Sequence, residues 1–113
     1  MAFELKTRDI RDVKVVDLQG RFVHGEPCVQ VRECVKGLAR NGEQKILVNL
    51  AGVDYLDSSG LGTLLECKTS VAGAGGKMHL VNAQSRVRDL LILTKLSTIF
   101  ELYENEAVAS LSF

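Results

Sequence analysis

The residues best suited to carry chemistry lie at mid-chain, in the run Asp57–Gly62, which reads Asp-Ser-Ser-Gly-Leu-Gly. It follows a short apolar run and precedes an amphipathic stretch, so it predicts the start of a helix. The first N–H groups of a helix have no partner within it, and the helix dipole makes that end positive. Either Ser58 or Ser59 could cap the helix, and a phosphate on one of them would lie near these donors.

Two glycines in this run favour a role beyond capping. Gly60 and Gly62 fall inside the predicted first turn, where each costs about 1 kcal/mol relative to alanine. A helix cap does not need glycine at these positions, whereas the close approach of another molecule to the helix start would. The pattern therefore predicts a docking surface at the start of this helix.

Catalysis by the same serines is a distant alternative. A serine nucleophile needs a base and an orienting acid, and in α/β hydrolases it lies in a Gly-x-Ser-x-Gly turn. Ser58 lacks that context, and only His24 and His79 could act as a base. We therefore predict no enzymatic activity, no cofactor and no metal site.

Charge and cysteine usage narrow the class of protein further. The 14 basic residues balance the 14 acidic ones, which argues against binding to nucleic acid or to an anionic membrane surface. No apolar run approaches the roughly 20 residues of a membrane span, and the first residues do not resemble a secretory signal, so we expect no membrane insertion. The three cysteines are odd in number and lack metal-ligand spacing, which predicts free thiols and a cytoplasmic location. They are Cys28, Cys34 and Cys67.

The pattern along the chain predicts an α/β fold in one domain. Strands are expected at 3–8, 13–18, 46–50, 78–81 and 99–103, with a loop at 20–27. Helices are expected around 31–38, from Ser58 or Ser59 to Gly73, from a cap at Ser85 onward, and from a cap at Asn105 to Leu111. The order β-β-α-β-α-β-α-β-α implies a mixed β-sheet with flanking helices and right-handed crossovers, and it leaves the strand order open.

Individual side chains of these elements can also be assigned. The run 46–50 lacks alternation and is typical of a strand that is buried on both faces. In the central helix the predicted core face carries Leu61, Leu64, Leu65 and Ala72. The run 90–93 is wider than one core stripe requires, which predicts that Ile92 or Leu93 is exposed on a partner surface.

Residues 49–62, Asn-Leu-Ala-Gly-Val-Asp-Tyr-Leu-Asp-Ser-Ser-Gly-Leu-Gly, closely resemble the signature of bacterial anti-sigma factor antagonists, which belong to the STAS domain family. The resemblance extends to the opening hairpin, to Leu-Gln-Gly at 18–20, to Lys-Met-His-Leu-Val at 77–81 and to Val-Arg-Asp-Leu-Leu at 87–91. It implies one STAS domain over residues 1–113.

The resemblance also implies a function. In this family the first serine of the pair is phosphorylated by an anti-sigma factor that is itself a serine/threonine kinase. Carried over, the acceptor is Ser58, and a serine phosphatase would restore the unmodified form. The unphosphorylated protein would bind the kinase, as a monomer or weak dimer, and so release the sigma factor. The implied partner-binding residues are Asp57, Ser59, Gly60, Leu61, Val23 and His24.

Two positions depart from the family pattern and leave other functions open. Relatives commonly carry Gly-Glu-Leu-Asp where this chain has Gly-Arg-Phe-Val at 20–23, so an acidic residue is missing and Val23 and His24 stand in its place. A glycine is also usual where Lys95 stands. The alternatives are a scaffold subunit of a larger STAS-containing sensory assembly, or a soluble STAS partner of a lipid or anion transporter.

Overall fold

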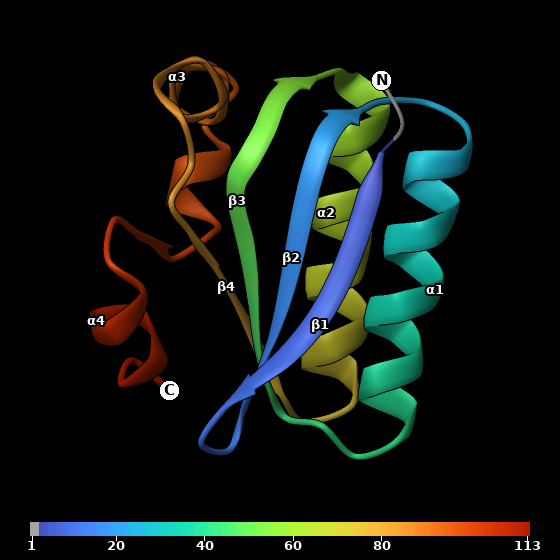
Figure 1. The fold of residues 1–113 in the computed structure, drawn as a ribbon, viewed down its shortest axis with the longest axis vertical. Coiled ribbons are helices and arrows are strands. Elements are labelled where there is room, and N and C mark those ends of the chain that lie inside the picture. Colours follow the sequence, from blue (N-terminus) through green and yellow to red (C-terminus); the bar gives the residue numbers. More distant parts are fainter. Residues whose placement is uncertain (1–2) are drawn as a thin grey trace.

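The fold is built on a five-stranded mixed sheet. The computed structural model describes residues 3–113. Its strands are β1 (Glu4–Ile10), β2 (Val13–Phe22), β3 (Lys45–Leu56), β4 (Lys77–Val81) and β5 (Leu102–Tyr103), and they lie side by side in chain order (Figure 1). β1 and β2 form an antiparallel hairpin, while β2, β3, β4 and β5 are parallel. The predicted mixed sheet, the opening hairpin and the alternation of strands and helices are confirmed.

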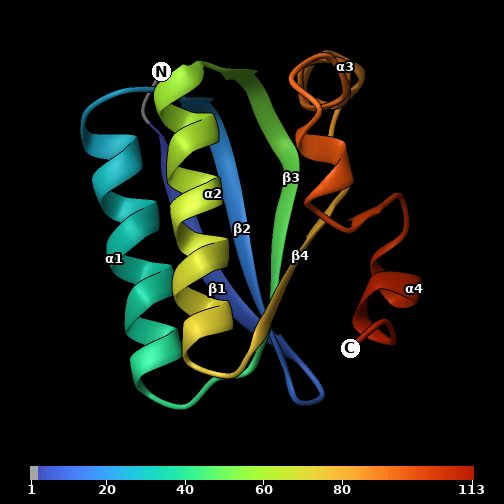
Figure 2. The same ribbon diagram turned by 180° about the vertical axis from the view of Figure 1, so that it is seen from behind.

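Two long helices cover one face of this sheet (Figure 2). They are α1 (Glu26–Arg40) and α2 (Ser58–Gly73), and right-handed crossovers from β2 to β3 and from β3 to β4 place both on the same side. The core beneath them includes Val31 and Val35 of α1 and Leu64 of α2, all fully buried. Ile46, Leu47 and Val48 of β3 are also fully buried, which confirms that the predicted run is covered on both faces, although the strand continues to Leu56 and its second half is partly exposed.

Within residues 3–113, the other face is covered mainly near the C-terminal helix. There α4 (Glu106–Ser110) buries Ala109 against Val15 and Leu47, and Asn105 caps this helix by accepting from the Val108 N–H. Arg8 joins the hairpin to this helix through ion pairs of 2.6 Å to both Asp17 and Glu106. The predicted cap at Asn105 is confirmed, while the helix ends at Ser110 rather than Leu111.

Several predicted boundaries are wrong. Strand β2 continues to Phe22 and α1 begins at Glu26, so most of the predicted loop at 20–27 is regular structure. Helix α3 (Ser85–Leu93) is preceded by Gln84, which takes the capping position that was predicted for Ser85. In α2 the core face includes Cys67 and Val71, which point toward the sheet. Ala72, which was predicted to lie on that face, is exposed.

The last strand is shorter than the predicted 99–103. A 3-10 helix at Leu96–Thr98 follows Lys95, and Phe100 is buried in the core, so pairing with β4 begins only at Leu102. Lys95 has a φ of +63°, a left-handed conformation that favours glycine. This explains why a glycine suits that position.

The three cysteines are unpaired, with Cys28 and Cys67 buried and Cys34 half-buried. Burial raises the pKa of the Cys67 thiol to about 12. Among residues 3–113, no helix combines the length and apolar character needed to cross a bilayer. The same residues contain no cluster of histidine, cysteine and carboxylate side chains able to hold a metal ion.

Candidate functional site

The predicted site lies where β3 ends and α2 begins. Asp57 stands between them in an extended conformation, and its Oδ1 accepts a hydrogen bond of 2.8 Å from the Gly60 N–H. Asp57 is therefore the N-cap of α2. The prediction that Ser58 or Ser59 caps the helix is wrong, because both residues lie within its first turn.

The second oxygen of Asp57 ties the helix start to the neighbouring strand. Oδ2 accepts a hydrogen bond of 3.0 Å from the backbone N–H of His24, just beyond the end of β2. Partial burial acts to raise the pKa of the Asp57 carboxyl, but hydrogen bonds from nearby backbone N–H groups outweigh it and hold the pKa below its ordinary value. One carboxylate thus fixes the position of two chain segments.

Gly60 packs against the same strand end. A Cβ on this residue would lie 2.4 Å from the carbonyl oxygen of Phe22 and 2.6 Å from Cδ1 of Leu56. The absent side chain is therefore required by contacts within the chain, and the sequence argument that Gly60 admits another molecule is wrong. Gly62 differs, because it is exposed and a Cβ there would meet nothing within 4 Å.

Ser58 is exposed at the first position of α2. Its hydroxyl makes no hydrogen bond to any residue from 3 to 113, and its neighbour Asp57 already occupies the cap. Ser59 is half-buried, and its carbonyl accepts from the Thr63 hydroxyl at 2.9 Å. The two serines therefore differ in access, and Ser58 is the more available of the pair.

The remaining residues predicted to bind a partner fall into two groups. His24 is exposed and Val23 is half-buried, and both lie beside Asp57 at the β2–α1 turn. Gly60 is buried and Leu61 is only 8% exposed within the core cluster. Their burial argues against direct contact with a partner, so the candidate surface does not include Gly60 or Leu61.

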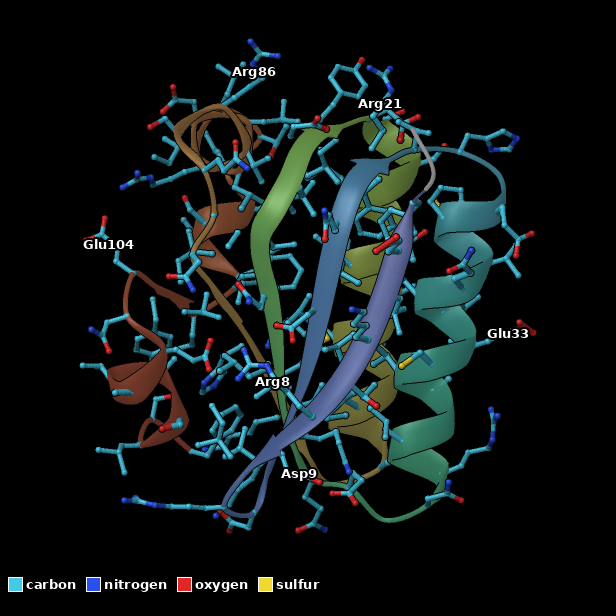
Figure 3. All side chains as sticks on the ribbon, viewed as in Figure 1. Arg8, Asp9, Arg21, Glu33, Arg86 and Glu104 are labelled. Atoms are coloured by element: carbon cyan, nitrogen blue, oxygen red, sulfur yellow. The ribbon has the colours of Figure 1, made fainter. Side chains whose placement is uncertain are left out.

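Two features next to this site were not predicted. The Arg21 guanidinium lies 4.4 Å from the centre of the Tyr55 ring, and Figure 3 shows Arg21 at the end of the molecule where α2 begins. A groove of about 340 Å³ extends from Tyr55 to Leu90 and Leu93 of α3. No pattern in the sequence predicts these contacts, because they join residues on separate strands and helices.

Two apolar side chains at the end of α3 are exposed, as the sequence predicted. Ile92 is 54% exposed and Leu93 is 80% exposed. The prediction that the run 90–93 leaves apolar side chains uncovered is confirmed.

The arrangement required for a serine hydrolase is not formed with His79. This histidine is buried at the middle of β4 and pairs with Leu47 near the beginning of β3, whereas Ser58 follows the end of β3. Its Nδ1 lies 2.8 Å from the Ser112 hydroxyl, and its ring stacks on Phe113 with centroids 4.3 Å apart. His79 is therefore a packing residue.

Comparisons with known proteins agree with this architecture. The STAS domain model matches residues 4–109, so the chain belongs to the STAS domain family. It is 27% identical over 109 residues to an anti-sigma F factor antagonist of Paenibacillus polymyxa, covering 96% of this chain and 93% of that protein.

Solved structures show the same fold. The crystal structure of an anti-sigma factor antagonist from Mycobacterium paratuberculosis matches with a TM-score of 0.83 at 21% identity, covering 96% of this chain and 91% of that one. The phosphorylated form of SpoIIAA, a Bacillus cell fate determinant, matches with a TM-score of 0.72 at 24% identity, covering 96% of both chains.

Proposed function

We propose that this protein is an anti-sigma factor antagonist that is switched by phosphorylation of Ser58. Unphosphorylated, it binds a cognate anti-sigma factor with serine/threonine kinase activity and so releases the sigma factor. Phosphorylation ends this binding, and a serine phosphatase restores it. ATP and magnesium belong to the kinase, and the exchange takes place in the cytoplasm.

The observation that carries this proposal is the exposed hydroxyl of Ser58, which makes no hydrogen bond within residues 3–113. It lies at a helix start that Asp57 connects both to Gly60 and to His24. A kinase needs an accessible hydroxyl, and here Asp57 rather than the serine accepts the capping hydrogen bond from the Gly60 N–H. The proposed contact surface consists of Ser58, Ser59 and Asp57, together with Val23 and His24 across the turn.

The expected effect of the phosphate lies at the interface. A phosphoserine carries about −1.5 to −2 charges at neutral pH, and it would stand beside the Asp57 carboxylate at the positive end of α2. In the complex the phosphate must be desolvated against groups that had bound a neutral hydroxyl. Lost hydrogen bonds and repulsion amount to about 3–4 kcal/mol, which weakens binding several-hundred-fold.

The test is to incubate the protein with a kinase-type anti-sigma factor and ATP, to map phosphate by peptide mass spectrometry and to measure binding. We expect phosphate on Ser58 of the wild type and of Ser59→Ala. Ser58→Ala should bind the anti-sigma factor whether or not ATP is present, and Ser58→Asp should bind poorly.

A matched control is Ser85→Ala, because Ser85 is also an exposed serine at the first position of a helix. This variant should behave as wild type. Phosphate on Ser59, or on neither serine of the pair, would contradict the proposal.

A further inference from the structure

The groove between the end of β3 and helix α3 adjoins the proposed contact surface. It has a volume of about 340 Å³, and its apolar walls are formed by Tyr55, Leu56, Val87, Leu90 and Leu93. Leu56 directly precedes Asp57 in the chain, so the groove is continuous with the surface around Ser58. Tyr55 and Leu93 are both exposed, which leaves the groove accessible from outside.

Arg21 provides a positive charge without an ionic partner at the Tyr55 end of this groove. It is exposed, and its guanidinium lies 4.4 Å from the centre of the Tyr55 ring. It forms no ion pair within residues 3–113. The contact with the ring positions the guanidinium but uses none of its N–H donors. These donors can therefore bind a carboxylate, whose two oxygens match the fork of a guanidinium.

The other charged residues at the groove leave this positive charge uncompensated. Arg86 and Asp89 are three residues apart on α3, so they are neighbours on the helix surface and offset each other. Both oxygens of the Asp57 carboxylate already accept backbone hydrogen bonds. Figure 3 shows Arg21 and Arg86 at the same end of the molecule. A complementary partner must therefore carry a negative charge that faces Arg21.

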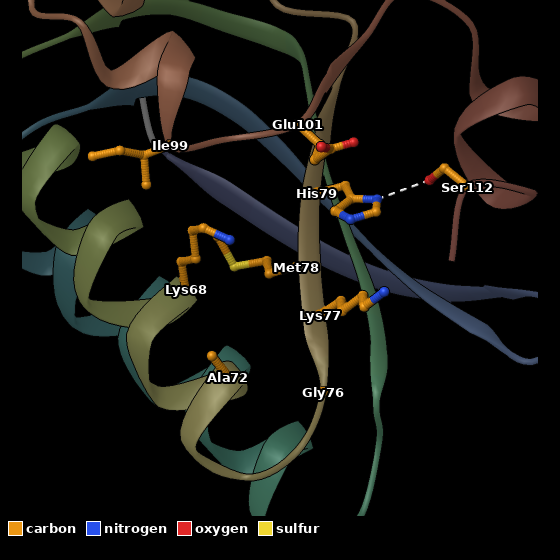
Figure 4. A pocket seen from close by; sticks show the side chains of 9 residues that line it. All are labelled: Lys68, Ala72, Gly76, Lys77, Met78, His79, Ile99, Glu101 and Ser112. Atoms are coloured by element: carbon orange, nitrogen blue, oxygen red, sulfur yellow. Dashed lines mark hydrogen bonds between the residues drawn. The ribbon is translucent and has the colours of Figure 1, made fainter.

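A second groove of similar volume, about 350 Å³, lacks this combination. It lies beside β4, and Figure 4 shows Lys68, Lys77 and Glu101 among the residues that line it. Lys77 pairs in register with Lys45 at the beginning of β3, whereas Ser58 follows the end of that strand. This groove is therefore separate from the proposed contact surface, and its residues are suitable controls.

We propose that the anti-sigma factor that contacts Ser58 also inserts a large apolar side chain into the groove between β3 and α3 and places a carboxylate against Arg21. This inference rests on the proposed function, because it names the chemistry of the same partner. Apolar anchors in pockets carry much of the binding energy of an interface, whereas charges at its rim guide approach and select the partner. Leu93 thus contributes to affinity, and Arg21 discriminates against an anti-sigma factor with a basic residue at the facing position.

The test measures the affinity of the unphosphorylated full chain for a kinase-type anti-sigma factor by isothermal titration calorimetry. Leu93→Gln and Arg21→Gln should each weaken binding by about tenfold. Both side chains are exposed, so the midpoint of urea denaturation should change little. The matched controls are Ile99→Gln and Lys77→Gln, which alter the second groove and should bind as wild type.

Charge reversal tests the pairing with Arg21 directly. Arg21→Glu should bind more weakly than Arg21→Gln, because it repels the carboxylate of the partner. When exposed carboxylates of the anti-sigma factor are replaced by lysine one at a time, one variant should restore binding to Arg21→Glu. Added salt should weaken the binding of wild type more than that of Arg21→Gln.

The inference is contradicted if Leu93→Gln and Arg21→Gln bind as tightly as wild type, if the controls lose as much affinity, or if no lysine substitution restores binding to Arg21→Glu. Sedimentation of the chain alone adds one more outcome, because a dimer that Leu93→Gln dissociates would show that a second copy covers the groove instead. In each of these cases, phosphate on Ser58 would still support the proposed function. A wild-type chain that neither binds the kinase nor gains phosphate would contradict the proposed function itself, and this inference with it.

Discussion

The starts of α2 and α3 have a similar local structure but are held in place by different contacts. Each helix follows a parallel strand of the sheet, and each has an exposed serine at its first position, Ser58 in α2 and Ser85 in α3. They differ in what holds them. Asp57 caps α2 with its side chain and also binds the β2–α1 turn, whereas the side chain of Gln84 makes no capping hydrogen bond and donates instead to the Ala51 carbonyl at 2.7 Å.

The difference favours Ser58 over Ser85 as the site of the proposed switch. Accessibility is common to both residues, but only the helix start at Ser58 has a side-chain cap. The same Asp57 carboxylate also binds the β2–α1 turn, and Gly60 packs closely against Phe22. Such a support lets a phosphate change the surface while the backbone stays in place. The predictions below test this support and compare it with the start of α3.

The largest effect is expected from Gly60→Ala. Its Cβ would lie 2.4 Å from the Phe22 carbonyl oxygen, so the helix start must move away from β2. We expect a loss of about 1–3 kcal/mol in the free energy of unfolding, measured by urea denaturation. The control is Gly62→Ala, which has open space and should stabilise the protein by up to about 1 kcal/mol. Equal stability of the two variants would show that Gly60 is not constrained by packing.

Asp57→Ala should come next. It removes the cap of α2 and leaves the His24 N–H without its partner, at a combined cost of about 1–2 kcal/mol. Gln84→Ala is the matched change before α3, and it should cost only about 0.5 kcal/mol because one side-chain hydrogen bond is lost. If both variants unfold at the same urea concentration, the two helix starts are not held differently.

The Asp57 carboxyl should also make stability depend on pH. Its pKa in the folded protein lies below the ordinary value of 3.8, so the unfolded chain takes up a proton more readily. The stabilisation is therefore present above that ordinary value and is lost as the pH falls toward the lowered pKa. Asp57→Asn should lose less stability than wild type on acidification through this range. Parallel stability curves for the two proteins would contradict the assignment.

The smallest effect is expected from Ser59→Ala. Because Asp57 occupies the cap, removing this hydroxyl should change the free energy of unfolding by less than about 0.5 kcal/mol. The backbone carbonyl that accepts from Thr63 remains in the variant. A loss of about 1 kcal/mol or more would mean that Ser59 contributes to the cap after all.

The sequence was sufficient to locate the candidate site in the fold but not to predict which contacts hold it in place. Apolar runs and turn residues predicted the hairpin, both long helices and the position of Ser58. They could not identify Asp57 as the cap, because that depends on the extended backbone of one residue and on its distance from the Gly60 N–H.

Contacts between distant segments account for the other errors. The reason for Gly60 lies at Phe22, on another strand, and no local pattern reports such a contact. The length of β5 depends on the burial of Phe100 and on the turn at Lys95. The predicted strand at 99–103 was therefore too long.

The central claim is that a phosphate on Ser58 changes the surface of the α2 start and leaves the fold intact. The most direct measurement compares amide NMR spectra and hydrogen exchange of the protein before and after phosphorylation, together with its affinity for the anti-sigma factor. We predict shifts confined to the first turn of α2 and the β2–α1 turn, unchanged protection in the core strands, and a several-hundred-fold loss of affinity. Shifts that spread through β3 and α1, or an affinity that phosphorylation leaves unchanged, would contradict the account.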